Sequence, residues 1–170
     1  MNSKERQFEA LVQETQRSIY RICYSFVSEA EEVEDLRQEI YIAVWKSMDR
    51  FEAKSSWNTF IYRIALNTAI TYYNRLKRRR EDRFVEAAQV DRVAEPETEE
   101  AAEVQERLQR MHACIRQLKE EDRLVISLVL ENLSYQEIAE VLDLTPSHVG
   151  VKIKRAKGRL LKLMNADGNA

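Results

Sequence analysis

Residues that break helices are scarce in this chain. It has only three glycines and two prolines among 170 residues, and both residue types destabilise a helix interior. Apolar residues recur at steps of three and four over most of the length, which places them on one face of a helix. With 44% hydrophobic residues, the chain can also bury a core. These features predict an all-α protein.

The apolar pattern divides the chain into two helical domains. Helical periodicity is strong before residue 87 and again after residue 103. Between these limits lie Pro96, six acidic side chains, one basic side chain and few bulky apolar residues, which is typical of a flexible linker. We therefore expect domains at 1–86 and 104–170, joined by an acidic linker at 87–103.

The second domain carries the pattern of a helix-turn-helix. Ser134 and Glu137 have the spacing of a capping box at the start of a short helix. Thr145 and Pro146 suit the N-cap and the first position of the next helix. Between Thr145 and Leu163 that helix has six bases and no acid. Two helices joined by about four residues are the arrangement of a DNA-binding helix-turn-helix.

The basic helix is predicted to have two faces. Four apolar residues spaced by four, three and four should face the core; they are Val149, Ile153, Ala156 and Leu160. The other side can enter a major groove, with side chains near its start on base edges and lysines on phosphates. The predicted contacts are Ser147, His148, Val151, Lys152, Lys154, Arg155 and Lys157. The alternative is a solvated helix whose bases complement its C-terminal dipole, and a solvated side chain suits His148 equally well.

A helix expected from about Ser56 to Arg80 suits unpaired nucleic acid. Amide side chains hydrogen-bond to nucleobases, aromatic rings stack on the nucleobases, and basic side chains hold the phosphates. The predicted contacts to a melted strand are Asn58, Arg63, Asn67, Thr71, Asn74 and Arg78. Four aromatic residues are not all expected to be buried in so small a domain; they are Trp57, Tyr62, Tyr72 and Tyr73. The alternative places the aromatic rings in the core and the polar side chains in water.

The helix before it has a buried stripe and an acidic face. The expected stripe is Val33, Leu36, Ile40 and Val44, and the opposite face holds Asp35, Gln38, Glu39 and Ile42. An acidic face with one aliphatic residue is a poor DNA surface but suits docking to a basic protein surface. The alternative is a solvated face.

Patterns of catalysis, metal binding and membrane insertion are missing from the sequence. It has no nucleophile motif, no metal-ligand cluster and no glycine-rich phosphate loop. Cys23 and Cys114 lack metal-type spacing and fall at apolar positions, so we expect reduced core cysteines. No run approaches the ~18 apolar residues of a membrane span, and the first residues lack a signal-peptide core. A cytoplasmic protein that is not an enzyme and has no cofactor is predicted.

Three segments together resemble the successive signatures of bacterial sigma factors, in particular the small two-domain extracytoplasmic-function group. They are VEDLRQEIYIAVW (33–45), FEAKSSWNTFIYRIALNTAI (51–70) and NLSYQEIAEVLDL (132–144) with the basic helix after it. The resemblance covers nearly the whole chain in the expected order. It implies binding to core RNA polymerase, recognition of two promoter elements and help in melting DNA.

The resemblance also implies roles for individual segments. Asp35, Leu36, Gln38 and Glu39 match the segment that docks on the polymerase clamp helices. The loop 49–56 and the start of the following helix match the part that holds the unpaired minus-ten strand. The helix 146–162 matches the reader of the duplex minus-thirty-five element. Many members of the family are held by an anti-sigma factor, so such a partner is expected here.

Some positions depart from the family pattern. Gly150 and Val151 cannot make the polar contacts that family members make from the recognition helix, so the promoter sequence does not transfer. Asp143 replaces a common turn glycine, from which a slightly different turn is expected. The alternative function is a helix-turn-helix regulator that acts without docking on polymerase.

Overall fold

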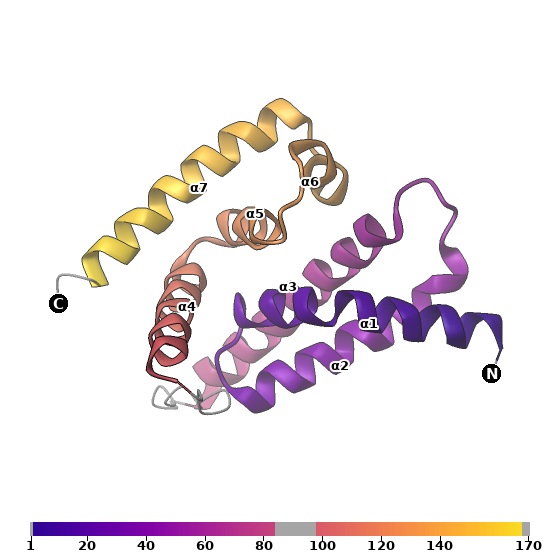
Figure 1. Ribbon diagram of the computed structural model, residues 1–170, viewed down its shortest axis with the longest axis horizontal. Helices are drawn as coiled ribbons and strands as arrows, with labels where there is room; N and C mark the ends of the chain where they lie inside the picture. The colour runs from indigo at the N-terminus through magenta and orange to yellow at the C-terminus, as the bar shows by residue number, and fades with distance from the viewer. Residues whose placement is uncertain (1, 84–97, 168–170) are drawn as a thin grey trace.

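The computed structural model describes residues 2–83 and 98–167, and these residues form helices arranged in two groups (Figure 1). The elements are α1 (Ser3–Tyr24), α2 (Ala30–Ser47), the short 3₁₀ helix η1 (Met48–Arg50), α3 (Trp57–Arg83), α4 (Glu99–Gln117), α5 (Glu120–Leu130), α6 (Tyr135–Leu142) and α7 (Pro146–Asp167). Helices α1–α3 form the first group and α4–α7 the second. The predicted all-α fold with two domains is confirmed.

The first domain is built around α2, which packs against both α1 and α3. The predicted stripe of α2 is buried, with Leu36 and Ile40 completely inaccessible. Tyr62 and Tyr72 are buried as well, while Trp57 and Tyr73 are partly buried. The expectation that the four rings cannot all be buried is therefore met, although α3 contacts α1, α2 and also α6 of the second domain.

The second domain packs around α5, which contacts α4, α6 and α7. Val125, Ile126 and Leu128 of α5 are buried. Helix α7 presents Val149, Ile153 and Ala156 to this core, with Leu160 packed at its edge. The predicted core face of the basic helix is therefore confirmed.

The helix-turn-helix has the caps that the sequence predicts. The Ser134 hydroxyl accepts a hydrogen bond from the Glu137 N–H at 3.2 Å, and the Glu137 carboxylate accepts one from the Ser134 N–H at 2.7 Å. The Thr145 hydroxyl accepts from the His148 N–H at 3.3 Å, and α7 begins at Pro146. Asp143 ends α6 at φ 55°, a left-handed conformation that glycine adopts more easily.

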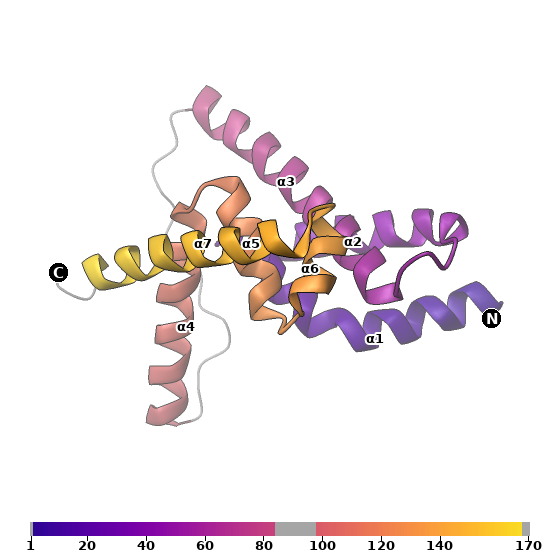
Figure 2. The same ribbon diagram turned by 90° about the horizontal axis from the view of Figure 1, so that it is seen from above.

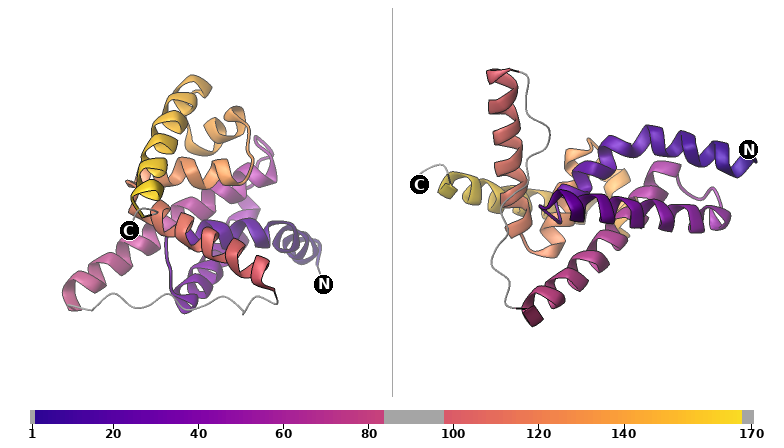
Figure 3. Two further views of the ribbon diagram at one scale, coloured as in Figure 1. Left: turned by 60° about the vertical axis from the view of Figure 1, so that its left-hand side comes forward. Right: turned by 90° about the horizontal axis from the view of Figure 1, so that it is seen from below.

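Helix α4 corrects the predicted linker at its C-terminal end. The helix begins at Glu99, and the Thr98 hydroxyl caps it by accepting from the Ala101 N–H at 3.1 Å. Residues 99–103 are thus helical, and the rest of the predicted linker up to 97 lies outside the described residues. The N-terminal end of α4 projects from the domain (Figures 2 and 3), which leaves Val104 and Leu108 half exposed.

Within the described ranges, the structure has no helix that combines the length and the apolar character needed to span a membrane.

Candidate DNA and polymerase surfaces

Helix α7 presents its predicted DNA face to solvent. Most of the predicted side chains are exposed, namely Ser147, His148, Val151, Lys154, Arg155 and Lys157, whereas Lys152 is partly buried. Val151 is 50% exposed although it is apolar. An apolar side chain on such a face can contact a thymine methyl group, which supplies one of the differences between base pairs in the major groove.

Two basic side chains of α7 form ion pairs within the protein. Lys152 Nζ lies 2.7 Å from a carboxylate oxygen of Glu121, and Arg159 pairs with Asp122, both on α5. The hydrogen bond from Lys152 lowers the pKa of Glu121 below its usual value. These pairs fix α7 on α5, whereas Lys154, Arg155 and Lys157 have no ion pair among the described residues and remain available for phosphates.

Tyr135 of α6 borders the same face. Its side chain is 53% exposed, and its ring lies beside Gly150 of α7. A Cβ atom at residue 150 would lie 3.4 Å from Tyr135 Cε2, which is van der Waals contact, so the ring packs directly against this position of α7. Helical periodicity alone cannot reveal this contact, because it joins residues of two different helices.

The polar stripe of α3 is exposed over its whole length. Asn58, Arg63, Asn67, Thr71, Asn74 and Arg78 all face solvent. The Thr71 hydroxyl donates to the Asn67 carbonyl at 2.9 Å, so it can only accept from a ligand. Arg63 differs from the others because it donates hydrogen bonds to the main-chain carbonyls of Glu140 and Val141 in α6.

Aromatic rings gather where the loop 49–56 enters α3. The Phe51 and Trp57 rings stack with centroids 3.7 Å apart, and Phe60 packs edge-on against both at 5.2 and 5.6 Å. Trp57 is among the aromatic residues expected beside the strand surface, whereas Phe51 and Phe60 are not. Phe60 follows Trp57 at the i,i+3 spacing of a helix, whereas Phe51 lies in the loop and only folding brings it to Trp57.

The acidic face of α2 borders a groove against α3. Asp35, Gln38 and Ile42 are exposed, while Glu39 is partly buried and pairs with Arg75 at 2.5 Å. Together with Tyr72, Arg75, Leu76 and Arg79, the four α2 side chains line a groove of about 420 Å³. Burial, followed by the charges of Asp35, Glu32 and Glu39, raises the pKa of Tyr72 to about 12.

Leu36 does not belong to this exposed face. Its side chain has no accessible surface, because it lies on the buried stripe of α2 between α1 and α3. The prediction of Leu36 as a contact to polymerase is corrected accordingly, and its role in the described structure is to hold α2 in the core.

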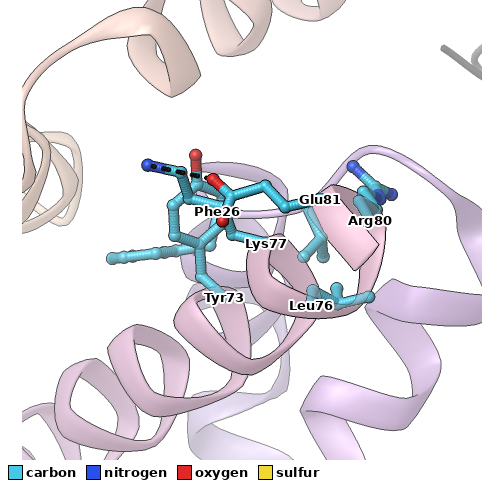
Figure 4. Close-up of a pocket in the computed structure, with 7 residues that line it drawn as sticks. Phe26, Tyr73, Leu76, Lys77, Arg80 and Glu81 are labelled. Carbon is cyan, nitrogen blue, oxygen red and sulfur yellow. Dashed lines mark ion pairs between the residues drawn. The ribbon is translucent and has the colours of Figure 1, made fainter. Parts of the chain in front are cut away.

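A second pocket opens at the C-terminal half of α3 (Figure 4). Phe26, Val27, Tyr73 and Leu76 form its apolar part, and Lys77, Arg80 and Glu81 form its charged rim. The two acids nearby limit the positive charge, since Lys77 pairs with Glu81 at 3.9 Å and Arg80 pairs with Glu32 at 2.5 Å. The described residues include no group of three or more potential metal ligands at this pocket or elsewhere.

These surfaces define a class of protein. An exposed basic helix within a helix-turn-helix fits duplex DNA. A polar stripe beside aromatic rings fits unpaired bases, and an acidic groove between α2 and α3 fits a protein partner. The chain therefore combines two candidate DNA surfaces, one on each domain, with a candidate protein-docking face.

Comparison with known families identifies this combination. The family model "Sigma-70 region 2" matches residues 11–79, and "Sigma-70, region 4" matches residues 108–160. The RNA polymerase sigma-H factor of Pseudomonas aeruginosa is 30% identical over 168 residues, which cover 94% of this chain and 87% of that protein. The ECF RNA polymerase sigma-E factor of Haemophilus influenzae is 32% identical, with 90% and 85% covered. The chain belongs to the extracytoplasmic-function sigma factors of the sigma-70 family.

Solved structures share the fold. CnrH in complex with the cytosolic domain of CnrY superimposes with a TM-score of 0.69 at 24% identity, and covers 96% of this chain and 90% of that one. The sigma factor RpoE of Bartonella quintana, in complex with the anti-sigma factor NepR, gives a TM-score of 0.71 at 20% identity, with 95% and 98% covered.

Proposed function

We propose that the chain binds core RNA polymerase in the cytoplasm and directs promoter-specific initiation of transcription, without a catalytic role of its own. The observation that carries this proposal is the combination of sigma-70 regions 2 and 4 in one chain with separate exposed surfaces on the two domains. A regulator that reads one duplex site needs the helix-turn-helix but has no use for an exposed amide-rich stripe on α3.

Each surface then has a proposed partner. Helix α7 reads the upstream duplex element through Ser147, His148, Val151, Lys152, Lys154, Arg155 and Lys157. The exposed side chains of α3, with the aromatic rings at its start, hold the melted strand. Asp35, Gln38, Glu39 and Ile42 dock on polymerase. The domain limits proposed for these roles are 1–86 and 104–170, with α4 extending the second domain back to Glu99.

An anti-sigma factor is the proposed inhibitor. Two structures with this fold are complexes, one with the cytosolic domain of CnrY and one with the anti-sigma factor NepR. Four large apolar side chains are exposed on α4 and α7, namely Val104, Leu108, Leu161 and Met164. Exposed apolar side chains of this kind are candidates for burial against a protein partner. A partner of this kind would keep the factor from polymerase until a signal releases it.

The experiment that tests the proposed function separates a sigma factor from a self-sufficient regulator. Promoter fragments from the native genome are incubated with the chain alone, with core polymerase alone and with both. A sigma factor retards a promoter fragment and supports initiation only when both are present. Retardation of the same fragment by the chain alone, at physiological salt and without any gain from polymerase, would establish the regulator instead.

A further inference from the structure

Arginine side chains join the two domains in the described structure. Arg21 of α1 donates to the carboxylate of Glu131 at 2.8 and 2.5 Å, and the Glu131 side chain is 2% exposed. Arg116 of α4 donates to the Tyr24 carbonyl at 2.7 Å. Two further arginines cross the domain boundary. Arg123 of α5 lies over the rings of Phe26 and Tyr73, and Arg63 of α3 donates to carbonyls of α6. Helices α3 and α6 consequently pack against each other across the domain boundary (Figures 1 and 2).

Arg63 is the member of this set that has a second proposed partner. Its Nη2 donates to the Glu140 carbonyl, and its Nε donates to the Val141 carbonyl at 3.4 Å. Both carbonyls lie in the last turn of α6, where main-chain acceptors lack partners within the helix and carry partial negative charge. The Nε–Nη2 edge of the guanidinium therefore caps α6 and is already occupied in the free chain.

The same edge is one that a guanidinium uses to bind a phosphate with two parallel hydrogen bonds. A phosphate carries a full charge, whereas the end of a helix carries about half of one. A melted strand that runs along the α3 stripe from Asn58 to Asn67 would pass Arg63, and its phosphate would compete with α6 for this edge. Arg63 cannot offer the edge to both.

We propose that Arg63 is an exchange contact: it holds α6 against α3 in the free chain and transfers to a phosphate of the melted strand when the promoter binds. This proposal rests on the function proposed above for the α3 stripe. Closure of the two domains and binding of the strand then oppose each other, and by linkage each weakens the other by the same factor.

The closure can be measured without polymerase. Spin labels at Glu9→Cys in α1 and Glu106→Cys in α4 report the distance between the domains, and both positions are exposed. The native cysteines do not interfere, because Cys23 and Cys114 are buried. Arg63→Ala is expected to raise the population at long distance on the order of three- to tenfold, the range for a charged hydrogen bond at an exposed site. Arg78→Ala removes the same charge from the same helix and is expected to leave the distances unchanged.

Exchange is tested by adding a mixed-sequence 12-nucleotide single-stranded DNA at low ionic strength. The DNA should shift the wild-type chain toward long distances and should add no further shift to Arg63→Ala. Arg63→Lys keeps a cation for the phosphate but loses the two-pronged cap on α6, so it should be open and still bind the strand. Wild-type distances in Arg63→Ala, or closed wild-type chain at saturating DNA, would overturn the proposal. Failure of the proposed function appears elsewhere, as absence of initiation with core polymerase.

Discussion

Lys154 and Arg155 are adjacent in sequence but are expected to contact different parts of the DNA. Lys154→Ala should weaken binding to all sequences alike and reduce the dependence of affinity on salt by about one unit of slope, as loss of one phosphate contact does. Arg155→Ala should cost ~1–3 kcal/mol at one base pair and relax the preference there. Holoenzyme binding to a promoter and to single-base variants, over a salt series, measures both effects. Equal behaviour of the two variants would contradict the division of roles.

His112 is expected to make stability depend on pH. Burial, and then the charges of Arg116 and Arg21, lower the pKa of His112 to about 4. The unfolded chain binds a proton near the ordinary pKa of about 6.5, so between these values the unfolded state holds more protons. The contribution of neutral His112 to the free energy of unfolding is therefore fully present above the unfolded pKa. It is lost as the pH falls, by about 2 kcal/mol between pH 7 and 5.

The matched variant for this prediction is His112→Gln, which cannot take up a proton. Urea unfolding at both pH values measures the free energy of unfolding of each protein. The fall on acidification should be smaller in the variant than in the wild type by the contribution of His112. An identical fall in the two proteins would show that His112 titrates alike in the folded and unfolded chain.

At the scale of elements, the acidic face of α2 is predicted to dock on polymerase through Asp35 more than through Glu39. Glu39 already pairs with Arg75, so part of its charge is satisfied within the chain. Asp35→Lys should weaken binding to core polymerase, with a larger loss at low salt, because it places a base against a basic partner. Glu9→Lys makes the same change on exposed α1. Fluorescence titration with core polymerase compares them, and equal affinities would remove Asp35 from the interface.

Helices were predictable from the sequence because their periodicity depends only on local spacing. The stripe of α2 and the core face of α7 follow from it directly. Periodicity shows that a face is apolar but not whether another element covers it. Val104 and Leu108 continue the stripe of Ile115 and Leu118, yet they stay half exposed because no helix of the described structure reaches that end of α4.

Contacts between distant elements could not be predicted in the same way. Arg63 has the position of a strand contact on α3, and nothing local indicates that it caps a helix 77 residues further along the chain. The contact of Tyr135 with Gly150 joins two helices, and the stack of Phe51 on Trp57 depends on the path of a loop. Sequence patterns thus located the surfaces, whereas the structure decided which members of each surface are free.

For the whole molecule, the segment between the domains limits how far they can separate. From Arg83 to Thr98 the chain reaches at most ~50 Å when extended, which matches roughly 15 base pairs at about 3.4 Å each. This limit is shorter than one based on residues 87–103, because α4 starts at Glu99. The domains can therefore occupy separate promoter elements only if this segment is nearly extended, or if the dimensions of the domains themselves span part of the distance between the elements.

The acids of this segment provide the last prediction. They would repel DNA, but they would suit a basic polymerase channel that otherwise holds nucleic acid. Glu95→Gln with Glu97→Gln removes two charges and keeps the length, so it should weaken core binding by a factor that shrinks at high salt.

The matched control for this variant is Glu99→Gln with Glu100→Gln. It removes two charges from the first turn of α4, where each acid stabilises the helix by about 0.3–1 kcal/mol through the dipole. This pair should lower the melting temperature of the second domain and leave core binding nearly unchanged. If both pairs bind core polymerase and initiate like the wild type at every salt concentration, the segment is a passive tether and its charge serves only to keep it off the DNA.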